Sequence, residues 1–297
     1  MFKVSKECSI YSMNSTNAPV LRVPAKSQVE FETFDCFENQ ICSEADEFDG
    51  LDFSRVNPAT GPVYIEGAEP GDILVVKIEK IEVASQGLCV ASNNMGVVAD
   101  LLDGYTIKIV PIKNDMAIFN DKISLPINKM IGVIGVAPKD GEDIATGVPD
   151  YHGGNMDCKE MTEGRELHLP VNVPGALLAI GDLHAVMADG EICGCGLEIS
   201  GTVTVSVDVI KNKTHIENPM LFSDTHIMTI ASHVDLDIAM EMAVSYMAKY
   251  LIREHGFDPK EAAMLMSMTA DVRICQVVDP KKTIRVEFPK YLCKTEV

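Results

Sequence analysis

The sequence comprises 297 residues, of which 46% are hydrophobic and 23% are charged. This balance indicates a globular protein with a substantial core and excludes a disordered chain. The 44 acidic residues outnumber the 25 basic ones, giving a formal net charge of −19. Such a surface repels nucleic acid and anionic membranes, so we expect neither as a partner.

The cysteine pattern and the distribution of apolar residues suggest a cellular compartment. The nine cysteines form no C-x-x-C pair, and several, such as Cys275 in VRICQVV, lie within apolar runs typical of a core. The N-terminal MFKVSKECSI has no apolar stretch of signal-peptide length, and no run approaches the roughly 18 residues that span a bilayer. We therefore expect a reduced, cytoplasmic protein.

Most of the chain up to residue 232 has the pattern of strands separated by turns. In DILVVKIEKIEV, residues 72–83, the apolar alternation through Ile78 resumes at Ile81 after two polar residues, which predicts a strand with a β-bulge. TVTVSVDVI at 202–210 and TIRVEF at 283–288 alternate regularly. Turn residues such as NPATGP at 57–62 and EPGD at 69–72 separate such runs.

Two helices are predicted near the end of the chain. Residues 235–256 place an apolar stripe on one face, and Gly256 is the expected C-cap. In DPKEAAMLMSM, Asp258 is the expected N-cap, Pro259 occupies the first helical position and Glu261 the third. With no linker or repeat, we expect a single domain with a β-rich part at 1–232 and the helical pair plus terminal strands at 233–297.

The segment HGGNMD, residues 152–157, combines potential ligands with two adjacent glycines. Gly153 and Gly154 allow positive φ and close backbone approach, so the loop could fold around a ligand. His152 and Asp157 could then converge on a metal, with Asn155 as a neutral hydrogen-bonding group. The alternative is a turn in which Asn155 and Asp157 bond their own backbone.

A larger constellation lies in LLAIGDLHAVMADGEICGCGLEISG, residues 177–201. Asp189-Gly190 between alternating segments predicts a two-residue hairpin turn. That register pairs His184 with Cys195 and Asp182 with Leu197, and it places five side chains on a single face. The five are Asp182, His184, Glu191, Cys193 and Cys195. Glu198 points to the other face unless a bulge intervenes.

Asp182 and His184 are the strongest metal-ligand pair in this segment. Side chains two residues apart on a strand project together, and nitrogen with carboxylate oxygen suits Zn²⁺, whereas an oxygen-rich set suits Ca²⁺ or Mg²⁺. Alternatively, Asp182 caps a turn and His184 is a hydrogen-bonded core residue. The remaining histidines have no clustered partners and are expected to be structural: His168, His215, His226, His233 and His255.

Several blocks of the chain resemble the acetamidase/formamidase family. They are NPATGPVYIEGAEPGDILVVKI at 57–78, IGVIGVAP at 131–138, HGGNMD at 152–157, and LHLPVNVPGALLAIGDLHAVMADGE with EISG across 167–201. The resemblance implies hydrolysis of small aliphatic amides to carboxylate and ammonia. It also implies a mainly β architecture of jelly-roll or sandwich type, a cytoplasmic homodimer or higher oligomer, and bound zinc or calcium.

One block departs from the formamidase pattern. VMADGE at 186–191 stands where that branch tends to have SQGDGE, so Met187 replaces a glutamine. The choice between formamide and acetamide therefore stays open.

Three hypotheses about function follow. In the first, His152, Asp157, Asp182 and His184 bind a metal that activates water, Glu191 or Glu198 transfers the proton, and Gly153, Gly154 and Asn155 contact the amide. In the second, Cys193 or Cys195 is the nucleophile and His184 its base. In the third, the same acidic face binds a cation or small ligand without catalysis.

Overall fold

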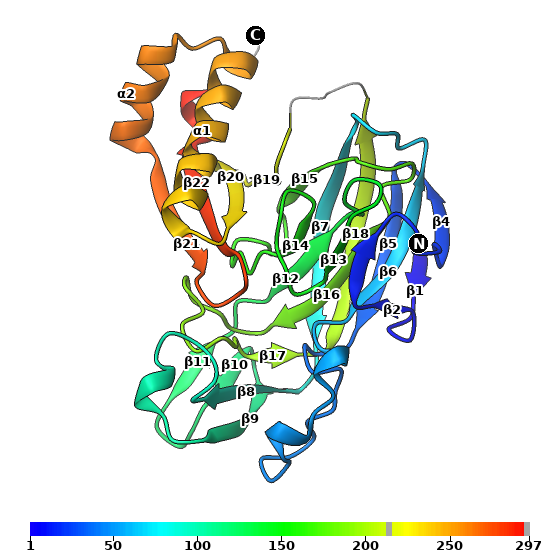
Figure 1. The fold of residues 1–297 in the computed structure, drawn as a ribbon, viewed down its shortest axis with the longest axis vertical. Coiled ribbons are helices and arrows are strands. Elements are labelled where there is room, and N and C mark those ends of the chain that lie inside the picture. The colour runs from blue at the N-terminus through cyan, green and yellow to red at the C-terminus, as the bar shows by residue number, and fades with distance from the viewer. Residues whose placement is uncertain (212–215, 294–297) are drawn as a thin grey trace.

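The computed structural model describes residues 1–211 and 216–293. It is mainly β, with two large sheets and a small one within these ranges. His215, which we expected to be structural, and the end of the predicted C-terminal part, 294–297, lie outside the described residues. Figure 1 shows the two helices at one end of the molecule and strands β8–β11 at the other.

The first sheet mixes strands from all parts of the chain. Its order is β1 (Phe2–Val4), β5 (Ser27–Thr33), β18 (Gly201–Ile210), β7 (Ile73–Val83), β15 (Glu166–Pro170), β19 (Met220–Phe222), β20 (His226–His233), β22 (Lys282–Pro289) and β21 (Asp271–Gln276). The two long central strands are the alternating segments expected from the sequence. The predicted bulge is confirmed, because the register slips at Glu79, between Ile78 opposite Val205 and Lys80 opposite Thr204.

The second sheet is branched. Its main path is β11 (Ser124–Pro126), β10 (Met116–Ile118), β9 (Tyr105–Lys113), β8 (Gln86–Ser92), β17 (Glu198–Ile199), β16 (Leu178–His184), β12 (Met130–Gly135) and β14 (Gly153–Asn155). Strand β6 (Ala59–Glu66) branches from β16 and pairs with β2 (Ser9–Ile10) and β4 (Leu21–Pro24). The small sheet pairs β3 (Ser12–Asn14) with β13 (Asp143–Ala145).

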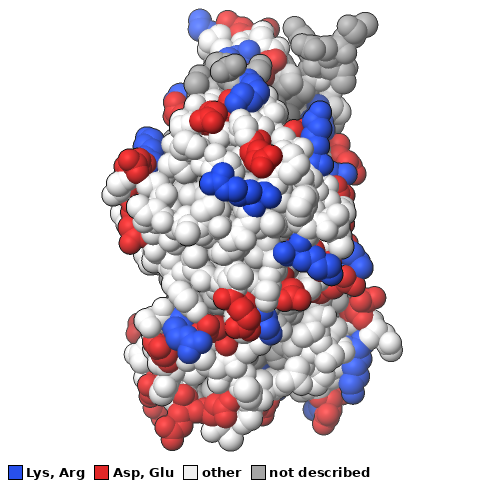
Figure 2. All heavy atoms as spheres, turned by 90° about the vertical axis from the view of Figure 1, so that its right-hand side faces the viewer, with Lys and Arg blue, Asp and Glu red and all other residues white. Residues whose placement is uncertain are grey.

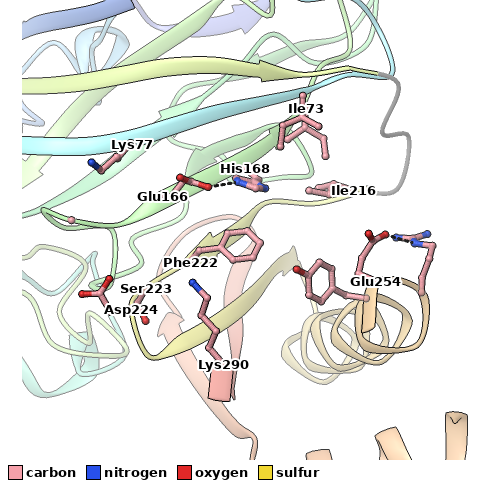
Figure 3. A pocket seen from close by; sticks show the side chains of 14 residues that line it. Ile73, Lys77, Glu166, His168, Ile216, Phe222, Ser223, Asp224, Glu254 and Lys290 are labelled. Atoms are coloured by element: carbon pink, nitrogen blue, oxygen red, sulfur yellow. Dashed lines mark hydrogen bonds and ion pairs between the residues drawn. The ribbon is translucent and has the colours of Figure 1, made fainter. Parts of the chain in front are cut away.

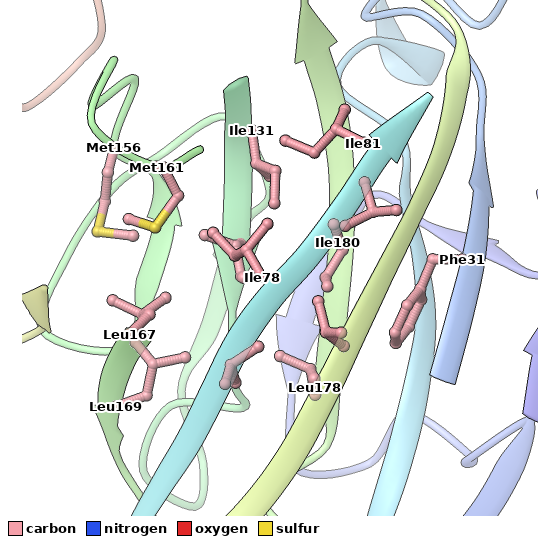
Figure 4. Close-up of a cluster of buried hydrophobic side chains, with 14 of the residues drawn as sticks. Phe31, Ile78, Ile81, Ile131, Met156, Met161, Leu167, Leu169, Leu178 and Ile180 are labelled. Atoms are coloured by element: carbon pink, nitrogen blue, oxygen red, sulfur yellow. The ribbon is translucent and has the colours of Figure 1, made fainter. Parts of the chain in front are cut away.

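The main core lies between the two large sheets. Apolar side chains of β5 and β7, such as Phe31 and Ile78, pack with Ile131 of β12 and Leu178 and Ile180 of β16 (Figure 4). All five are buried. Two sheets that enclose one apolar layer form a sandwich, which confirms the expected mainly β architecture.

The C-terminal helices agree with their predicted boundaries. Helix α1 (Leu236–His255) ends at Gly256 in the left-handed conformation, and α2 (Pro259–Thr269) begins after Asp258, whose side chain accepts hydrogen bonds from the amides of Lys260 and Glu261. Helix α1 packs on β20 and β22 through Ala243, Met247 and other buried residues. No helix in 1–211 or 216–293 is long and apolar enough to cross a membrane.

Four short 3₁₀ turns complete the structure: η1 (Phe48–Gly50), η2 (Phe53–Arg55), η3 (Ala99–Leu101) and η4 (Lys290–Leu292). On the face shown in Figure 2, acidic and basic side chains are interspersed, and red groups gather toward the lower end. That face carries no continuous basic area of the kind that binds nucleic acid.

Candidate active site

Strand β16 carries two polar residues at the centre of the second sheet. Asp182 and His184 are 2% and 1% exposed, on a strand whose residues are all buried. The pairing of β16 with β12 brings Gly132 of β12 close to Asp182 and also to Asp157, a second acid of the site. A Cβ atom on Gly132 would lie 2.6 Å from Asp157 Oδ1 and from Asp182 Oδ2. A glycine at this position therefore leaves room for carboxylates that any other residue would displace.

The structure corrects the expected hairpin register. Leu183 pairs with Ile199 and His184 with Glu198, so the sequence prediction that paired His184 with Cys195 is wrong. The physical reason is that Gly190 bridges to Gln276 and exchanges backbone hydrogen bonds with Cys275 and Val277, which converts the expected tight turn into a wide loop.

The corrected register places Glu198 beside the histidine. Glu198 Oε2 lies 3.1 Å from His184 Nε2, and Asp182 Oδ1 lies 3.4 Å from the same nitrogen. The amide of Gly196 donates to Glu198 Oε1 at 2.8 Å and fixes the second oxygen. Glu198 therefore lies on the face of His184, the arrangement expected only if the regular hairpin register is interrupted, and the glutamate is an immediate neighbour of the imidazole.

The HGGNMD segment brings Asp157 to the opposite side of the same ring. Strand β14 pairs with β12 through Gly153 and Gly154, both with positive φ, and added Cβ atoms there would meet carbonyl oxygens at 2.3 and 2.5 Å. The two glycines are needed for a close backbone approach, as expected. The groups that they approach are the carbonyl groups of Ile134 and Val148. Asp157 Oδ1 then lies 3.9 Å from His184 Nδ1.

His152 does not join the other expected ligands. It is fully buried, but it belongs to neither of the ligand-compatible groups found among the described residues. Burial lowers its pKa to about 4, so the ring is neutral, and its charged neighbours are Asp150 and Lys281. Of the four expected metal ligands, Asp157 and Asp182 lie within 4 Å of His184, and His152 is not grouped with them.

Two groups of side chains have donor atoms close enough to hold a cation. Asp157, His184 and Glu191 form one, with donor atoms within 4.8 Å of one another, and Cys36, Asp182 and Glu198 form the other. The contacts of His184 with Asp182 and Glu198 join the two groups into one cluster. We call these six residues the acid–histidine cluster.

Burial dominates the electrostatics of the cluster. It raises the pKa of Asp157, Glu191 and Glu198, and the neighbouring carboxylates add to the effect. Burial opposes protonation of His184, but the charges of Glu198 and Asp182 outweigh it and raise the pKa of the imidazole well above its usual value. Proton-binding groups with perturbed pKa values gathered around one ring are typical of catalytic sites.

The cluster also contains polar atoms without partners and strained backbone. Within 1–211 and 216–293, no hydrogen-bonding group satisfies Asp157 Oδ1, Asp182 Oδ1, Glu198 Oε2 or His184 Nδ1. Buried groups in this state usually contact a water or an ion. Asp157, Asp182 and Glu191 all have positive φ, at 43°, 54° and 45°, a conformation that concentrates at functional sites. The nitrogen, oxygen and sulfur donors therefore fit a divalent metal.

Comparisons with known proteins identify the family of the chain. A profile of the Acetamidase/Formamidase family matches residues 17–142 and 140–293. The chain belongs to the acetamidase/formamidase family. A crystal structure of an acetamidase from Bacillus halodurans is 44% identical, with a TM-score of 0.96 and 98% of each chain covered. A predicted acetamidase/formamidase from Thermoanaerobacter tengcongensis is 45% identical, with a TM-score of 0.95 over 98% of this chain and 96% of its own.

Curated relatives of the family are more distant. The formamidase of Methylophilus methylotrophus is 25% identical, and the match covers 79% of this chain and 76% of the relative. The chain spans 60% of the length of a relative from Schizosaccharomyces pombe and 57% of the acetamidase of Mycolicibacterium smegmatis. Family membership supports amide hydrolysis as the activity.

The two cysteines proposed as nucleophiles in this family member are poorly placed for attack. Cys195 packs among Leu88 and Val90, and Cys193 Sγ lies 3.3 Å from the carbonyl oxygen of Cys195. A hydrogen bond with Cys89 and burial raise the pKa of Cys193. In Cys195 the contact with Cys89 acts in the opposite direction, but burial and the charge of Glu198 still raise its pKa. Both thiols are therefore protonated at neutral pH, which weakens a nucleophile.

Two residues at or beside the acid–histidine cluster were not predicted from the sequence. Cys36 lies in FDCFEN, far from the other groups, and no spacing links it to them. Asp279 follows β21, accepts a hydrogen bond from Asn155 Nδ2 at 3.1 Å, and has its pKa raised by burial and by Asp157. An acid beside a turn proline, as in VVDPKK, is a common pattern, so only the fold identifies it.

A separate cavity of about 450 Å³ lies between β15, β19 and α1 (Figure 3). His168 Nε2 lies 2.7 Å from Glu166 Oε1, and its ring packs on Phe222 with centroids 4.4 Å apart. None of the residues lining it belongs to the acid–histidine cluster. The expectation of a structural role for His168 is compatible with these contacts.

Proposed function

We propose that this family member hydrolyses small aliphatic amides to carboxylate and ammonia at the acid–histidine cluster. The observation that carries the proposal is a buried imidazole contacted on both sides by carboxylates, whose oxygens nearest the ring have no hydrogen-bond partner among the described residues. The family assignment supplies the amide bond as the target.

The cluster has the donors for a divalent metal. Asp157, His184 and Glu191 would hold one ion, and Cys36, Asp182 and Glu198 offer a second set of donors. Mixed nitrogen, oxygen and sulfur donors favour zinc over calcium. A bound metal would polarise the amide oxygen and lower the pKa of a water molecule.

Residues of the protein itself then transfer the protons. Glu191 is the partly exposed member of the cluster and can take a proton from water through a carboxylate oxygen that does not contact the metal. Burial raises the pKa of Glu198, which lies against His184 Nε2, so this carboxyl group can carry a proton to the leaving nitrogen. The Gly196 amide keeps Glu198 oriented toward the ring. The nitrogen must be protonated to depart as ammonia.

Asn155 is the residue that we expect to bind the amide nitrogen. Asn155 is buried, donates to Asp279, and has an Oδ1 atom without a described partner. That oxygen can accept a hydrogen bond from the amide nitrogen. Gly153 and Gly154 place Asn155 at the site through their pairing with β12, and this is the role we assign to them.

The decisive experiment measures ammonia release from formamide, acetamide and propionamide together with elemental analysis of the purified protein. Glu198→Gln should lower kcat at least about 100-fold, while Glu82→Gln, at an exposed ion pair with Lys80, should not. Cys193→Ala and Cys195→Ala should both retain turnover, and loss in either would restore the thiol mechanism. No ammonia from any amide, with zinc bound and the fold intact, would favour a non-catalytic binding protein.

We also propose a cytoplasmic homo-oligomer. All nine cysteines are free thiols, which suits a reducing compartment. Val97 and Leu101 are 63% and 84% exposed, and such apolar side chains suit a subunit contact. Analytical ultracentrifugation would show a dimer or larger species, and a monomer at micromolar concentration would contradict this.

A further inference from the structure

A second cavity, of about 300 Å³, adjoins the acid–histidine cluster. Glu191 and Gly196 line it, and Glu191 contributes to the first ligand group. A Cβ atom on Gly196 would lie 3.0 Å from the ring of His184, so this lining glycine packs directly against the imidazole. Asp157 and His184 are each 1% exposed, whereas Glu191 is partly exposed. The cavity therefore reaches the cluster at Glu191, its partly exposed member.

The walls of this cavity are apolar. They include Val110 of β9, Ala117 of β10, and Phe119, Leu125 and Met187. Phe119, Leu125 and Ile192 at its rim are 39%, 40% and 60% exposed, a concentration of large apolar side chains that a solvent-facing surface does not require. An apolar group bound in the cavity would cover them.

The charged residues of the lining have one sign. Only Asp189 and Glu191 are ionisable acids there, and no lysine, arginine or histidine lines the cavity. Asp189 is already paired with Arg285 and Lys159. The lining itself therefore offers an anionic ligand no cation, whereas a neutral apolar group needs none.

The volume of the cavity is larger than the smallest amides require. A cavity of roughly 150 Å³ holds a benzene ring, so about 300 Å³ leaves formamide or acetamide surrounded by empty apolar space. Met187, at the position where the formamidase pattern has glutamine, contributes to this wall. The residue that departs from the formamidase pattern thus makes the cavity more apolar.

We propose that this cavity binds the acyl group of the substrate, and that the preferred substrates are primary amides with a neutral, apolar acyl chain of about five to eight carbons. This inference rests on the proposed amidase function. The chain would lie against Val110, Phe119 and Leu125, and its carbonyl group would lie beside Glu191, the metal-binding acid of the cluster that lines the cavity.

The test is a series of kcat/KM values for acetamide, butanamide, hexanamide and the anionic amide succinamate. Burying one methylene is worth about fourfold in kcat/KM. We expect hexanamide to exceed acetamide at least tenfold, and succinamate to fall below butanamide, which has the same number of carbons.

Variants tie the preference to the cavity. Ala188→Trp, at an exposed lining position, should fill the space and lower the hexanamide-to-acetamide ratio at least tenfold. Ile123→Trp, at an exposed position of the β10–β11 hairpin outside the lining, should leave the ratio unchanged. Circular dichroism checks the fold of both variants. Acetamide turnover with no increase along the wild-type series, or efficient hydrolysis of succinamate, would overturn the acyl site alone. Failure to hydrolyse any amide would overturn the amidase proposal as well.

Discussion

The ion pair between Asp189 and Arg285 gives a quantitative test of how the loop beside the site is held. Arg285 has a side chain only 2% exposed, and its guanidinium donates to both oxygens of Asp189, at 2.6 and 2.9 Å. Glu287 accepts a third bond at 2.6 Å. Asp189 also pairs with Lys159 at 3.0 Å and precedes Glu191 by two residues.

We expect Asp189→Asn to lower the free energy of unfolding by about 2–3 kcal/mol. Removing one partner of a buried ion pair costs about 3–5 kcal/mol. Asp189 is 25% exposed, and the asparagine oxygen can still accept one of the two bonds, so we reduce that figure accordingly. Urea denaturation of both proteins measures the difference.

The pH dependence provides a second readout. Burial alone would raise the pKa of Asp189, but its bonds with Arg285 hold it below the usual value. A carboxyl group with a depressed folded-state pKa contributes stability above its unfolded-state pKa, and this contribution is lost as the pH falls through the folded-state value. The gap between Asp189→Asn and the wild type should therefore close in acid.

The matched control is Asp271→Asn. Asp271 also accepts from an arginine, Arg273, at 2.7 Å, but the two side chains are 63% and 49% exposed. Exposed pairs contribute little, so this variant should unfold close to the wild type. Equal destabilisation by the two substitutions, or none by Asp189→Asn, would refute the reasoning.

Three further predictions follow from the site and its surroundings. Gly132→Ala should lower kcat at least about 100-fold, because its Cβ would lie 2.6 Å from carboxylate oxygens of Asp157 and Asp182; Gly50→Ala, with its nearest atom at 3.7 Å, is the control. Burial raises the pKa of Asp35 to about 6. A carboxyl group with a raised folded-state pKa loses its stabilising contribution as the pH rises through that value. Asp35→Asn should therefore be more stable than the wild type at pH 7.5, by up to about 3 kcal/mol, and equally stable at pH 4. Urea titrations at both pH values check this. Prolonged chelation should lower Tm, and zinc should restore it in a calorimetric scan; an unchanged Tm and no metal by elemental analysis would contradict metal binding.

The elements that the sequence predicts well are those with local causes. The caps at Gly256 and Asp258 depend on neighbouring residues alone, and both helices begin and end as expected. The bulge near Glu79 is visible as a phase change in a single strand. In each case the pattern and its physical cause lie within a few residues.

The site was only partly predictable because its register and its members depend on distant segments. Gly190 forms a bridge with Gln276, some 86 residues away, so the local Asp-Gly signal does not decide the turn. Cys36 and Asp279 reach the site from opposite ends of the chain. His152 shares a segment with Asp157 but lies outside the cluster, because adjacency in sequence does not fix where a loop side chain points.

The central pairing of the first sheet has a consequence for biosynthesis. Strand β7 ends at Val83 and its long partner β18 begins at Gly201, so about 120 residues must be added before the pair can form. At roughly 5–20 residues per second, translation takes about 6–24 s over that interval. During this time the apolar residues of β7 have no β18 to pair with, and the nascent chain offers a binding site for chaperones that disappears once the sandwich closes.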